Sequence, residues 1–277
     1  MNPGTPRRGL RGYLRLVCGL DDLGKSTLTS QSFRAPMHLS KPWLDGETLV
    51  VNAVNPTAGL LTGDSVETQV KVESGASLLF TTPSASRAYR TLAGTIELTQ
   101  DFAVAAGGRL EVFPEMFIPQ AGASCAQRTR VDIESGGEML WIDVVAPGRV
   151  AMGESFEYRL LDWRMDVFLD RKQVVRERSV LEPGKPNLNA LRKVFPNAYY
   201  GSLFWIGGKA DGASDILKRI TALQSGDVWV GASRLCGGGL TVKILAANSP
   251  AMRQAIHEIR RRIHEFRGFH GPDLRKL

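Results

Sequence analysis

Runs of strand-forming residues separated by short turns fill most of this sequence, and that feature limits the fold more than any other. Apolar and polar residues alternate from Ser65 to Val72, which predicts a strand with one buried face. Residues 76–80 are mostly apolar, which indicates a strand covered on both faces. The turn between them, Glu73-Ser74-Gly75, is short enough to predict that the two strands form a hairpin.

The same arrangement continues along the chain. Further strands are predicted at Thr95 to Val104, Arg109 to Phe113, Ser124 to Ile133, Glu138 to Val145, Phe156 to Leu161, Arg164 to Leu169 and Gln173 to Val180. The strands that flank Asp162-Trp163 are expected to be separated by a turn there. Glycine turns spaced roughly ten residues apart are typical of an all-β region, which we place at residues 11–182. No fixed repeat accompanies them, so a β-helix-like stack and a closed sandwich are both open.

The pattern changes after a linker near Pro183-Gly184, where an α+β region is predicted at residues 187–267. Its strands and helices are expected at Tyr199 to Ile206, Ser214 to Leu223, Val228 to Leu235, Leu240 to Ala247 and Ala251 to Phe266, with Asp211 or Ser214 capping the first helix. Ser249 is expected to cap the last helix, with Pro250 in its first turn. Residues 1–10 are predicted to be a disordered tail, and residues 268–277 a second tail.

Composition limits the kind of partner and the cellular compartment that suit this chain. The net charge of +7, from 35 basic and 28 acidic residues, favours acidic partners without selecting one. Cys18, Cys125 and Cys236 lie far apart, which argues against a disulfide framework and favours a reducing compartment. The sequence has neither an apolar run long enough to cross a bilayer nor a typical signal peptide. We therefore expect a cytoplasmic protein that is not associated with a membrane.

Gly19 to Ser26 matches the phosphate-loop pattern G-x-x-x-x-G-K-[ST]. A phosphate loop needs a helix that begins at the lysine, but the following residues are β-branched and polar and end at Pro36. The pattern therefore favours a hairpin turn over a nucleotide site.

The last helix offers a second alternative, because basic residues can neutralise phosphates in nucleic acids. Its basic residues lie largely off the apolar stripe: Arg253, Arg260, Arg261, Arg262 and Arg267. No nucleic-acid-binding module accompanies them, so a solvated basic face or a protein-docking helix is the preferred interpretation. His257 and His264 lie two helical turns apart, too far to share a metal, and His38 is expected to be a packed or surface side chain.

Carboxylates are scattered through the chain, and Asp143 and Glu177 stand out because they lie inside predicted strands. A carboxylate that points inward from a strand needs a partner or a metal. The sequence contains no H-E-x-x-H or C-x-x-C motif, no Ser/His/Asp order and no evident nucleophile. The residues alone therefore indicate a binding or scaffold protein rather than an enzyme.

Several segments together resemble one protein family. The most specific is the run from Thr81-Thr82-Pro83 to Tyr89-Arg90, which follows Gly63-Asp64 and the alternating strand. Leu110 to Glu115 and Arg176-Glu177-Arg178 match further motifs. This pattern resembles the urease accessory protein family UreD, also called UreH, over nearly the whole chain.

The resemblance implies a β-helix-like stack of short strands with a smaller α+β part that ends in a basic amphipathic helix. It also implies a non-catalytic urease maturation factor that binds urease apoprotein and UreF-like and UreG-like accessory proteins. Nickel would pass transiently through an interior channel, with no tightly bound cofactor. The candidate channel carboxylates are Asp64, Asp143 and Glu177, with Ser84 beside the Thr-Thr-Pro turn and Tyr89 and Arg90 completing the family-motif turn. The alternative is a β-rich protein that binds nucleic acid or nucleotides.

Overall fold

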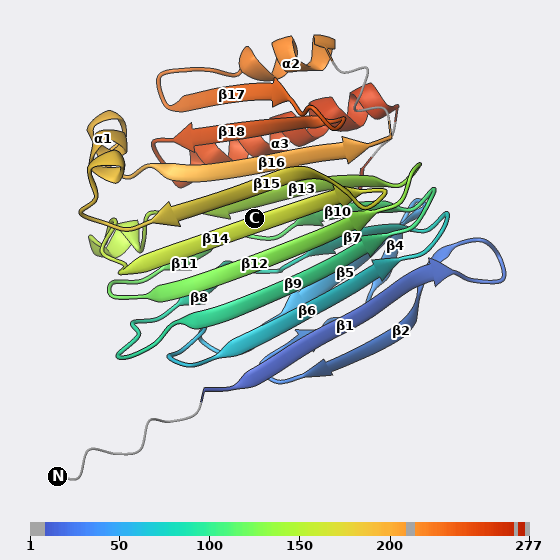
Figure 1. Ribbon diagram of the computed structural model, residues 1–277, viewed down its shortest axis with the longest axis horizontal. Helices are drawn as coiled ribbons and strands as arrows, with labels where there is room; N and C mark the ends of the chain where they lie inside the picture. The colour runs from blue at the N-terminus through green and yellow to red at the C-terminus, as the bar shows by residue number, and fades with distance from the viewer. Residues whose placement is uncertain (1–8, 209–213, 269–270, 275–277) are drawn as a thin grey trace.

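The computed structural model describes residues 9–208, 214–268 and 271–274 of the chain. Strands dominate, and they form two sheets that lie one in front of the other in Figure 1. Apolar side chains from both sheets pack in shared core clusters. The protein is therefore mainly β, as the spacing of the turns predicts.

The first sheet has seven strands, and its five central strands run parallel. In spatial order the strands are β15 (Lys172–Leu181), β14 (Leu160–Leu169), β12 (Ser124–Ile133), β9 (Ile96–Val104), β6 (Ser65–Val72), β1 (Arg11–Leu20) and β2 (Ser26–Arg34). The two edge strands, β15 and β2, pair antiparallel with their neighbours.

The second sheet has eleven strands and contains a parallel block of β5, β7, β10 and β13. Its main path is β17 (Val228–Arg234), β18 (Leu240–Ala246), β16 (Tyr199–Gly207), β13 (Glu138–Val145), β10 (Arg109–Phe113), β7 (Ser77–Thr81), β5 (Thr48–Val54) and β3 (His38–Leu39), with β4 (Trp43–Asp45), β8 (Ser86–Ala88) and β11 (Phe117–Pro119) off this path. The antiparallel strands β16, β18 and β17 extend the parallel block at one edge.

From β5 to β14 the chain passes back and forth between the sheets, so each coil adds one strand to the first sheet and one or two strands to the second. The hairpin predicted for residues 65–80 is therefore wrong. β6 pairs with β1 and β9, whereas β7 pairs with β5 and β10. Gly75 adopts a φ of 74° at the corner where the chain crosses from one sheet to the other. A glycine turn suits a coil corner as well as a hairpin, because both need a residue with positive φ.

Successive corners stack on one another and close the coil. The N–H of Arg109 donates to the carbonyl of Ala76 at 2.9 Å, and the N–H of Glu138 donates to that of Gly108 at 3.0 Å. The Ser74 hydroxyl donates to the carbonyl of Ala106, 32 residues along the chain. These bonds satisfy backbone groups that an isolated turn would leave to water, and they decide between the two architectures in favour of the stack.

Two further boundaries differ from expectation. The turn predicted at Asp162-Trp163 is wrong because β14 is continuous there and pairs in register with β12. Phe156, expected to open a strand, instead lies in a loop with a φ of 57°. A 3-10 helix at Val150–Met152 and helix α1 at Pro186–Val194 were not expected.

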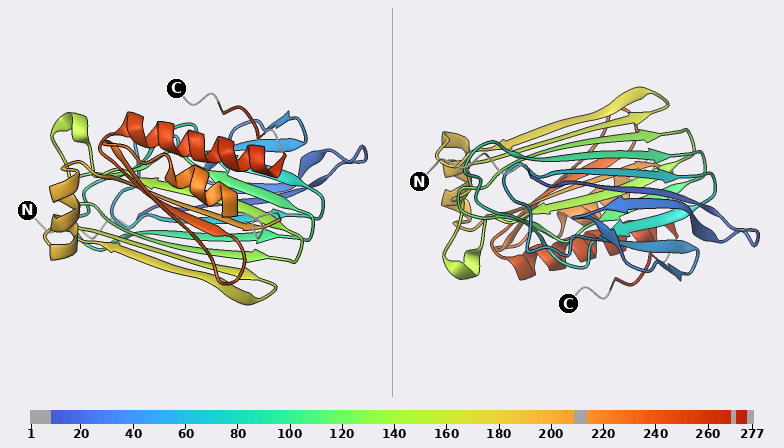
Figure 2. Two further views of the ribbon diagram at one scale, coloured as in Figure 1. Left: turned by 90° about the horizontal axis from the view of Figure 1, so that it is seen from above. Right: turned by 90° about the horizontal axis from the view of Figure 1, so that it is seen from below.

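The C-terminal helices α2 (Ser214–Thr221) and α3 (Ser249–Arg267) cover the outer face of the second sheet near β16–β18 (Figure 2). Met252, Ile256 and Ile259 of α3 are almost fully buried there, as the apolar stripe predicts. The cap lies one residue earlier than expected. Asn248 has an extended backbone and accepts from the N–H of Ala251 at 2.9 Å, whereas Ser249 is already helical.

The basic face of α3 is solvated only in part, because the side chains of Arg260 and Arg267 are largely buried while more than half of the Arg261 side chain is exposed. Arg260 is buried against Glu111 of β10, and Arg267 pairs with Glu138 of β13 at 2.8 Å. The other three arginines pair as well: Arg253 with Glu115, and Arg261 and Arg262 with Glu258. Glu111, Glu115 and Glu138 are far from the helix in the sequence, so spacing on the helix alone could not reveal them, whereas Glu258 lies on α3 itself, three and four residues before Arg261 and Arg262.

Of the helices formed by the described residues, none combines the length and apolar character that crossing a bilayer requires. Residues 1–8, 269–270 and 275–277 of the expected tails lie outside the described ranges, and so does Asp211, a predicted helix cap.

Candidate functional site

A row of polar side chains crosses the inner face of the first sheet. Thr68 of β6, Gln100 of β9 and Thr129 of β12 are neighbours in register, and all three lie at positions that alternate inward. The Thr129 hydroxyl donates to Gln100 Oε1 at 2.8 Å. The same row continues through Met165 of β14 to Glu177 of β15.

The second sheet contributes a facing row. Asp143 of β13, Ser202 of β16 and Lys243 of β18 are register neighbours. The Lys243 ammonium donates to Ser202 Oγ at 2.6 Å and also to Glu177 Oε2, so it joins the two sheets. Tyr200 Oη donates to the other oxygen of Glu177 at 3.3 Å. The two rows together form what we call the polar layer.

The polar layer separates two apolar parts of the core. Val70, Phe102 and Val131 belong to one apolar cluster, while Val66 and Cys125 on the same strands belong to another. A fold held together only by apolar burial has no need of polar groups between such clusters, and burying them costs free energy unless they are paired. The polar layer is therefore a candidate functional site.

Asp143 has the most perturbed carboxyl in the polar layer. Burial raises its pKa from the ordinary value to about 6, and the negative charge of Glu177 adds to the rise. A hydrogen bond from Trp141 Nε1 to Asp143 Oδ2, at 2.6 Å, and the Lys243 ammonium oppose it. Burial also lowers the pKa of Lys243, against the effect of Glu177. An elevated carboxyl pKa in an internal site is typical of a functional group.

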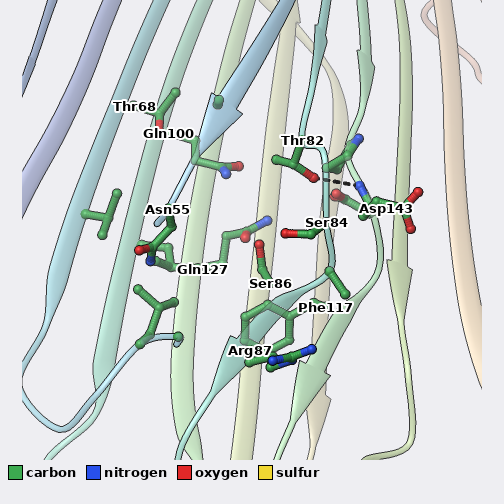
Figure 3. Close-up of a pocket in the computed structure, with 18 of the residues that line it drawn as sticks. Asn55, Thr68, Thr82, Ser84, Ser86, Arg87, Gln100, Phe117, Gln127 and Asp143 are labelled. Atoms are coloured by element: carbon green, nitrogen blue, oxygen red, sulfur yellow. Dashed lines mark hydrogen bonds between the residues drawn. The ribbon is translucent and has the colours of Figure 1, made fainter. Parts of the chain in front are cut away.

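The polar layer lines a main cavity of about 210 Å³ between the sheets (Figure 3). Gln100, Gln127 and Asp143 reach it from β9, β12 and β13, and Ser84 and Ser86 come from the Thr-Thr-Pro segment. Amides, hydroxyls, the Arg87 guanidinium and the carboxylates of Glu115 and Asp143 stand among apolar side chains in its wall, so the cavity offers polar contacts to water or to a small polar species.

Three further hollows adjoin the main cavity in series. An inner chamber of about 40 Å³ shares Gln127, Asp143 and Trp163 with it and is also lined by Glu177. An end groove of about 640 Å³ shares Tyr200 with the inner chamber and is also lined by Lys243. On the other side, an outer hollow of about 560 Å³ shares residues 82–85 with the main cavity. The polar layer thus lies among adjoining hollows, with the end groove and the outer hollow as the first and last members of the series.

The three candidate carboxylates have different positions. Asp143 lines the main cavity and the inner chamber, and Glu177 lines the inner chamber. Asp64 is buried, and its two oxygens accept from the N–H groups of Leu10 and Leu61, each at 2.8 Å. Asp64 is not among the described residues that line the four hollows. Its contacts secure the turn before β6 to the start of β1.

The family-motif turn has two parts. Ser84 lies on the wall between the main cavity and the outer hollow. Tyr89 and Arg90 instead support the coil: a Cβ added at Gly59 would lie 2.8 Å from Tyr89 Cε2, and one at Gly122 would lie 2.9 Å from Arg90 Cγ. Both side chains therefore require glycine in the neighbouring segment.

The histidines that the structure describes do not lie in a cluster of metal-ligating side chains. In the residues that the structure covers, no group of three or more His, Cys, Asp or Glu side chains could hold a metal ion. His38 packs against Phe33 and His257 against Phe113, with ring centroids 5.0 and 5.5 Å apart. His264 lies 3.2 Å from Glu111.

The phosphate-loop match is a hairpin turn, as predicted. It connects β1 to β2, and Asp21 Oδ1 accepts from the N–H groups of Leu23 and Lys25 at 2.9 and 2.8 Å. Lys25 is exposed at the tip, and a strand follows in place of the helix that phosphate binding needs.

Sequence reasoning missed Gln127 of the main cavity and five members of the polar layer, namely Thr68, Gln100, Thr129, Ser202 and Lys243. A signal was present for Thr68, Gln100 and Thr129, because each occupies an inward position of an alternating strand that otherwise carries apolar residues. What the sequence did not reveal is that the members of the polar layer fall into register across two sheets.

The fold and the site define a class: a β-solenoid scaffold whose interior carries a transverse polar layer between adjoining hollows. The comparisons with known proteins agree on one family. Residues 10–275 match the family model of the UreD urease accessory protein. The chain therefore belongs to the UreD urease accessory protein family.

Three similar proteins illustrate the relationship, and all three are named urease accessory protein UreD. The chain is 38% identical over 254 residues to the one from Opitutus terrae, with 90% of this chain and 92% of that protein covered. It is 32% identical over 269 residues to the one from Deinococcus radiodurans, with 94% of each covered. It is 29% identical over 269 residues to the one from Actinomyces naeslundii, with 95% and 97% covered.

Proposed function

We propose that this chain is a non-catalytic, cytoplasmic urease maturation factor that passes nickel through its interior towards the urease active site. Its partners would be urease apoprotein and UreF-like and UreG-like accessory proteins. The relatives named above are urease accessory proteins, which supports a role in producing active urease. The passage of nickel and the individual partners are the parts of the proposal that need direct tests.

The observation that carries the proposal is the polar layer at the middle of the series of hollows. Asp143 faces both the main cavity and the inner chamber, and Glu177 faces the inner chamber next to it. A cation that moved between the outer hollow and the end groove would meet these two carboxylates in turn. Gln100, Gln127 and Ser84 would offer further oxygen atoms along the main cavity.

The chemistry of this lining suits transfer better than storage. Carboxylate, amide and hydroxyl oxygens are harder donors than the imidazole nitrogens that hold nickel firmly. Two carboxylates together still attract a divalent cation, because their charges lie in a region of low dielectric constant. The cation would therefore be drawn in and released again, as a conduit requires.

Urease activation in cells tests the proposal. We compare strains that carry the host urease genes and either the wild-type chain, no chain, or the double variant Asp143→Asn/Glu177→Gln. The amides keep the size of each side chain and remove both charges. The proposal expects urease activity to fall at least about tenfold in the double variant, at equal protein abundance and with partner binding intact.

Asp132→Asn is the matched control, because Asp132 lies on β12 and pairs with Arg130, with 45% of its side chain exposed. It should leave activity unchanged. Full urease activity in the double variant would overturn the nickel path, and full activity without the chain would overturn the maturation role.

Two structural observations bear on the alternatives that the sequence left open, nucleotide binding and nucleic-acid binding. Lys25 lies in a hairpin turn and not at the start of a helix. The five arginines of α3 pair with carboxylates of the chain itself. Neither observation favours nucleotide or nucleic-acid binding as a second function.

A further inference from the structure

Lys243 occupies the boundary between the inner chamber and the end groove. It extends from β18 at a half-buried position and lines the end groove. The groups that its ammonium contacts, Glu177 and Ser202, both line the inner chamber. The ammonium therefore lies where the two hollows meet.

Three contacts hold the ammonium in place. It donates to Glu177 Oε2 and to Ser202 Oγ, and it lies 4.5 Å from the ring centroid of Phe204. The carboxylate, the hydroxyl and the aromatic face are each favourable surroundings for a cation. The same three groups would also favour a metal cation at this point.

The side chain nevertheless has room to move. The Lys243 side chain is 37% exposed, and the Glu177 side chain is 24% exposed. The end groove beside them is the largest of the four hollows. A lysine side chain has four rotatable bonds and a strongly hydrated head group, so it can leave the carboxylate for water in the groove at little cost.

We infer that Lys243 is the gate between the inner chamber and the end groove. At rest its ammonium is bound to the Glu177 carboxylate, and it must swing into the end groove before a divalent cation can pass. The inference rests on the proposed function and adds the residue that controls it. At rest the ammonium neutralises one of the two carboxylates and repels an incoming cation. When it moves away, Asp143 and Glu177 together present two negative charges to the inner chamber.

Binding of Ni²⁺ alone to the full-length chain, measured by titration calorimetry, tests the gate. Lys243→Met keeps the length of the side chain and removes the charge. One unit charge about 4 Å away, at an effective dielectric constant near 20, is worth more than a factor of ten in a binding constant. The association constant for Ni²⁺ should therefore rise at least about tenfold.

The rise must depend on the carboxylate that the ammonium releases. Lys243→Met/Glu177→Gln should return the affinity to the wild-type value or below it, and Lys243→Arg, which keeps the charge, should resemble wild type. Lys71→Met is the matched control, because Lys71 is also a strand lysine paired with a glutamate, at 3.5 Å from Glu73. If Lys243→Met does not fold, Lys243→Gln serves in its place.

The result that overturns the gate is an affinity in Lys243→Met, or in Lys243→Gln, that equals that of wild type. Failure of the gate and failure of the path are distinguishable. Loss of urease activation in Glu177→Gln with unchanged nickel affinity in Lys243→Met overturns the gate and leaves the path. Normal activation in Glu177→Gln with a tenfold rise in Lys243→Met supports the control of a cation site by Lys243 and overturns the path.

Discussion

The buried ion pair between Glu111 and Arg260 should be one of the main contacts that hold α3 on the second sheet. Only 10% of the Arg260 side chain and 7% of the Glu111 side chain is exposed. Arg260 also donates to the carbonyl of Pro272 at 3.1 Å. Arg260→Met would keep the volume and the apolar stem but leave the Glu111 carboxylate buried without its guanidinium partner.

The cost follows from that burial. Breaking a buried pair by removing one partner costs about 3–5 kcal/mol, because the remaining charge loses its compensation in a region of low dielectric constant. For a domain of this size, each kcal/mol lowers the melting temperature by about 2–4 °C. Thermal unfolding followed by circular dichroism should therefore show a decrease on the order of 10 °C.

Two comparisons make this result specific. Arg261→Met removes an arginine on the same helix whose side chain is 55% exposed and pairs with Glu258, so it should cost less than about 1 kcal/mol. Glu111→Leu/Arg260→Met removes both charges and should recover most of the loss, since an apolar pair of similar volume often replaces a buried ion pair without cost. Equal melting temperatures for Arg260→Met and Arg261→Met, or a double variant less stable than Arg260→Met, would refute the reasoning.

Three further predictions concern other parts of the molecule. Burial raises the pKa of Asp143 to about 6, so between about pH 4 and 6 the folded state binds more protons than the unfolded state, and this group lowers the stability of the fold as the pH rises through that window. Asp143→Asn should remove this part of the dependence of unfolding free energy on pH, measured by urea titrations at several pH values. An unchanged pH dependence would contradict the prediction. Burial alone would raise the pKa of Glu111, but Arg260 and His264 outweigh it and hold that pKa at about 2. The Glu111 carboxylate therefore stabilises the fold above its pKa in the unfolded chain, and this stabilisation is lost as the pH falls towards 2. Below about pH 4, the unfolding free energy should depend less on pH in Glu111→Gln than in wild type. Gly207 has a φ of 79°, and an added Cβ would lie 2.1 Å from the Gly137 carbonyl oxygen. Gly207→Ala should therefore destabilise the junction of β13 and β16 by more than about 1 kcal/mol. A melting temperature equal to that of wild type would contradict this prediction.

The sequence predicts individual strands better than it predicts how they combine. The alternation around Val66, Thr68, Val70 and Val72 correctly identifies one buried face of β6. The turn at Gly75 is also real, but its local residues do not specify whether the next strand joins the same sheet. That choice depends on stacking against Gly107 and Gly108 of the next coil, a contact between segments far apart in the chain.

The candidate site shows the same limit. Asp143 and Glu177 stand out because carboxylates are unusual inside strands, and the structure places both at the inner chamber. Lys243 and Ser202 carry no such signal, since a lysine or serine in an alternating strand is ordinarily assigned to the solvent face. They come next to Glu177 and Asp143 only through the pairing of β16 with β13 and β18. Asp64 matches a family motif, but its oxygens accept from the backbone N–H groups of Leu61, in the turn before β6, and of Leu10, just before β1.

The most direct test of the central claim is whether nickel crosses the interior of the chain. Labelled Ni²⁺ would be loaded onto the accessory complex, and its arrival on urease apoprotein would be measured with a chelator in solution that is too large to enter the hollows. The account predicts transfer that resists the chelator with the wild-type chain and with Asp132→Asn, and transfer that is lost with Asp143→Asn/Glu177→Gln. Transfer that the chelator abolishes with the wild-type chain, or that the double variant supports equally well, would contradict a path through the polar layer.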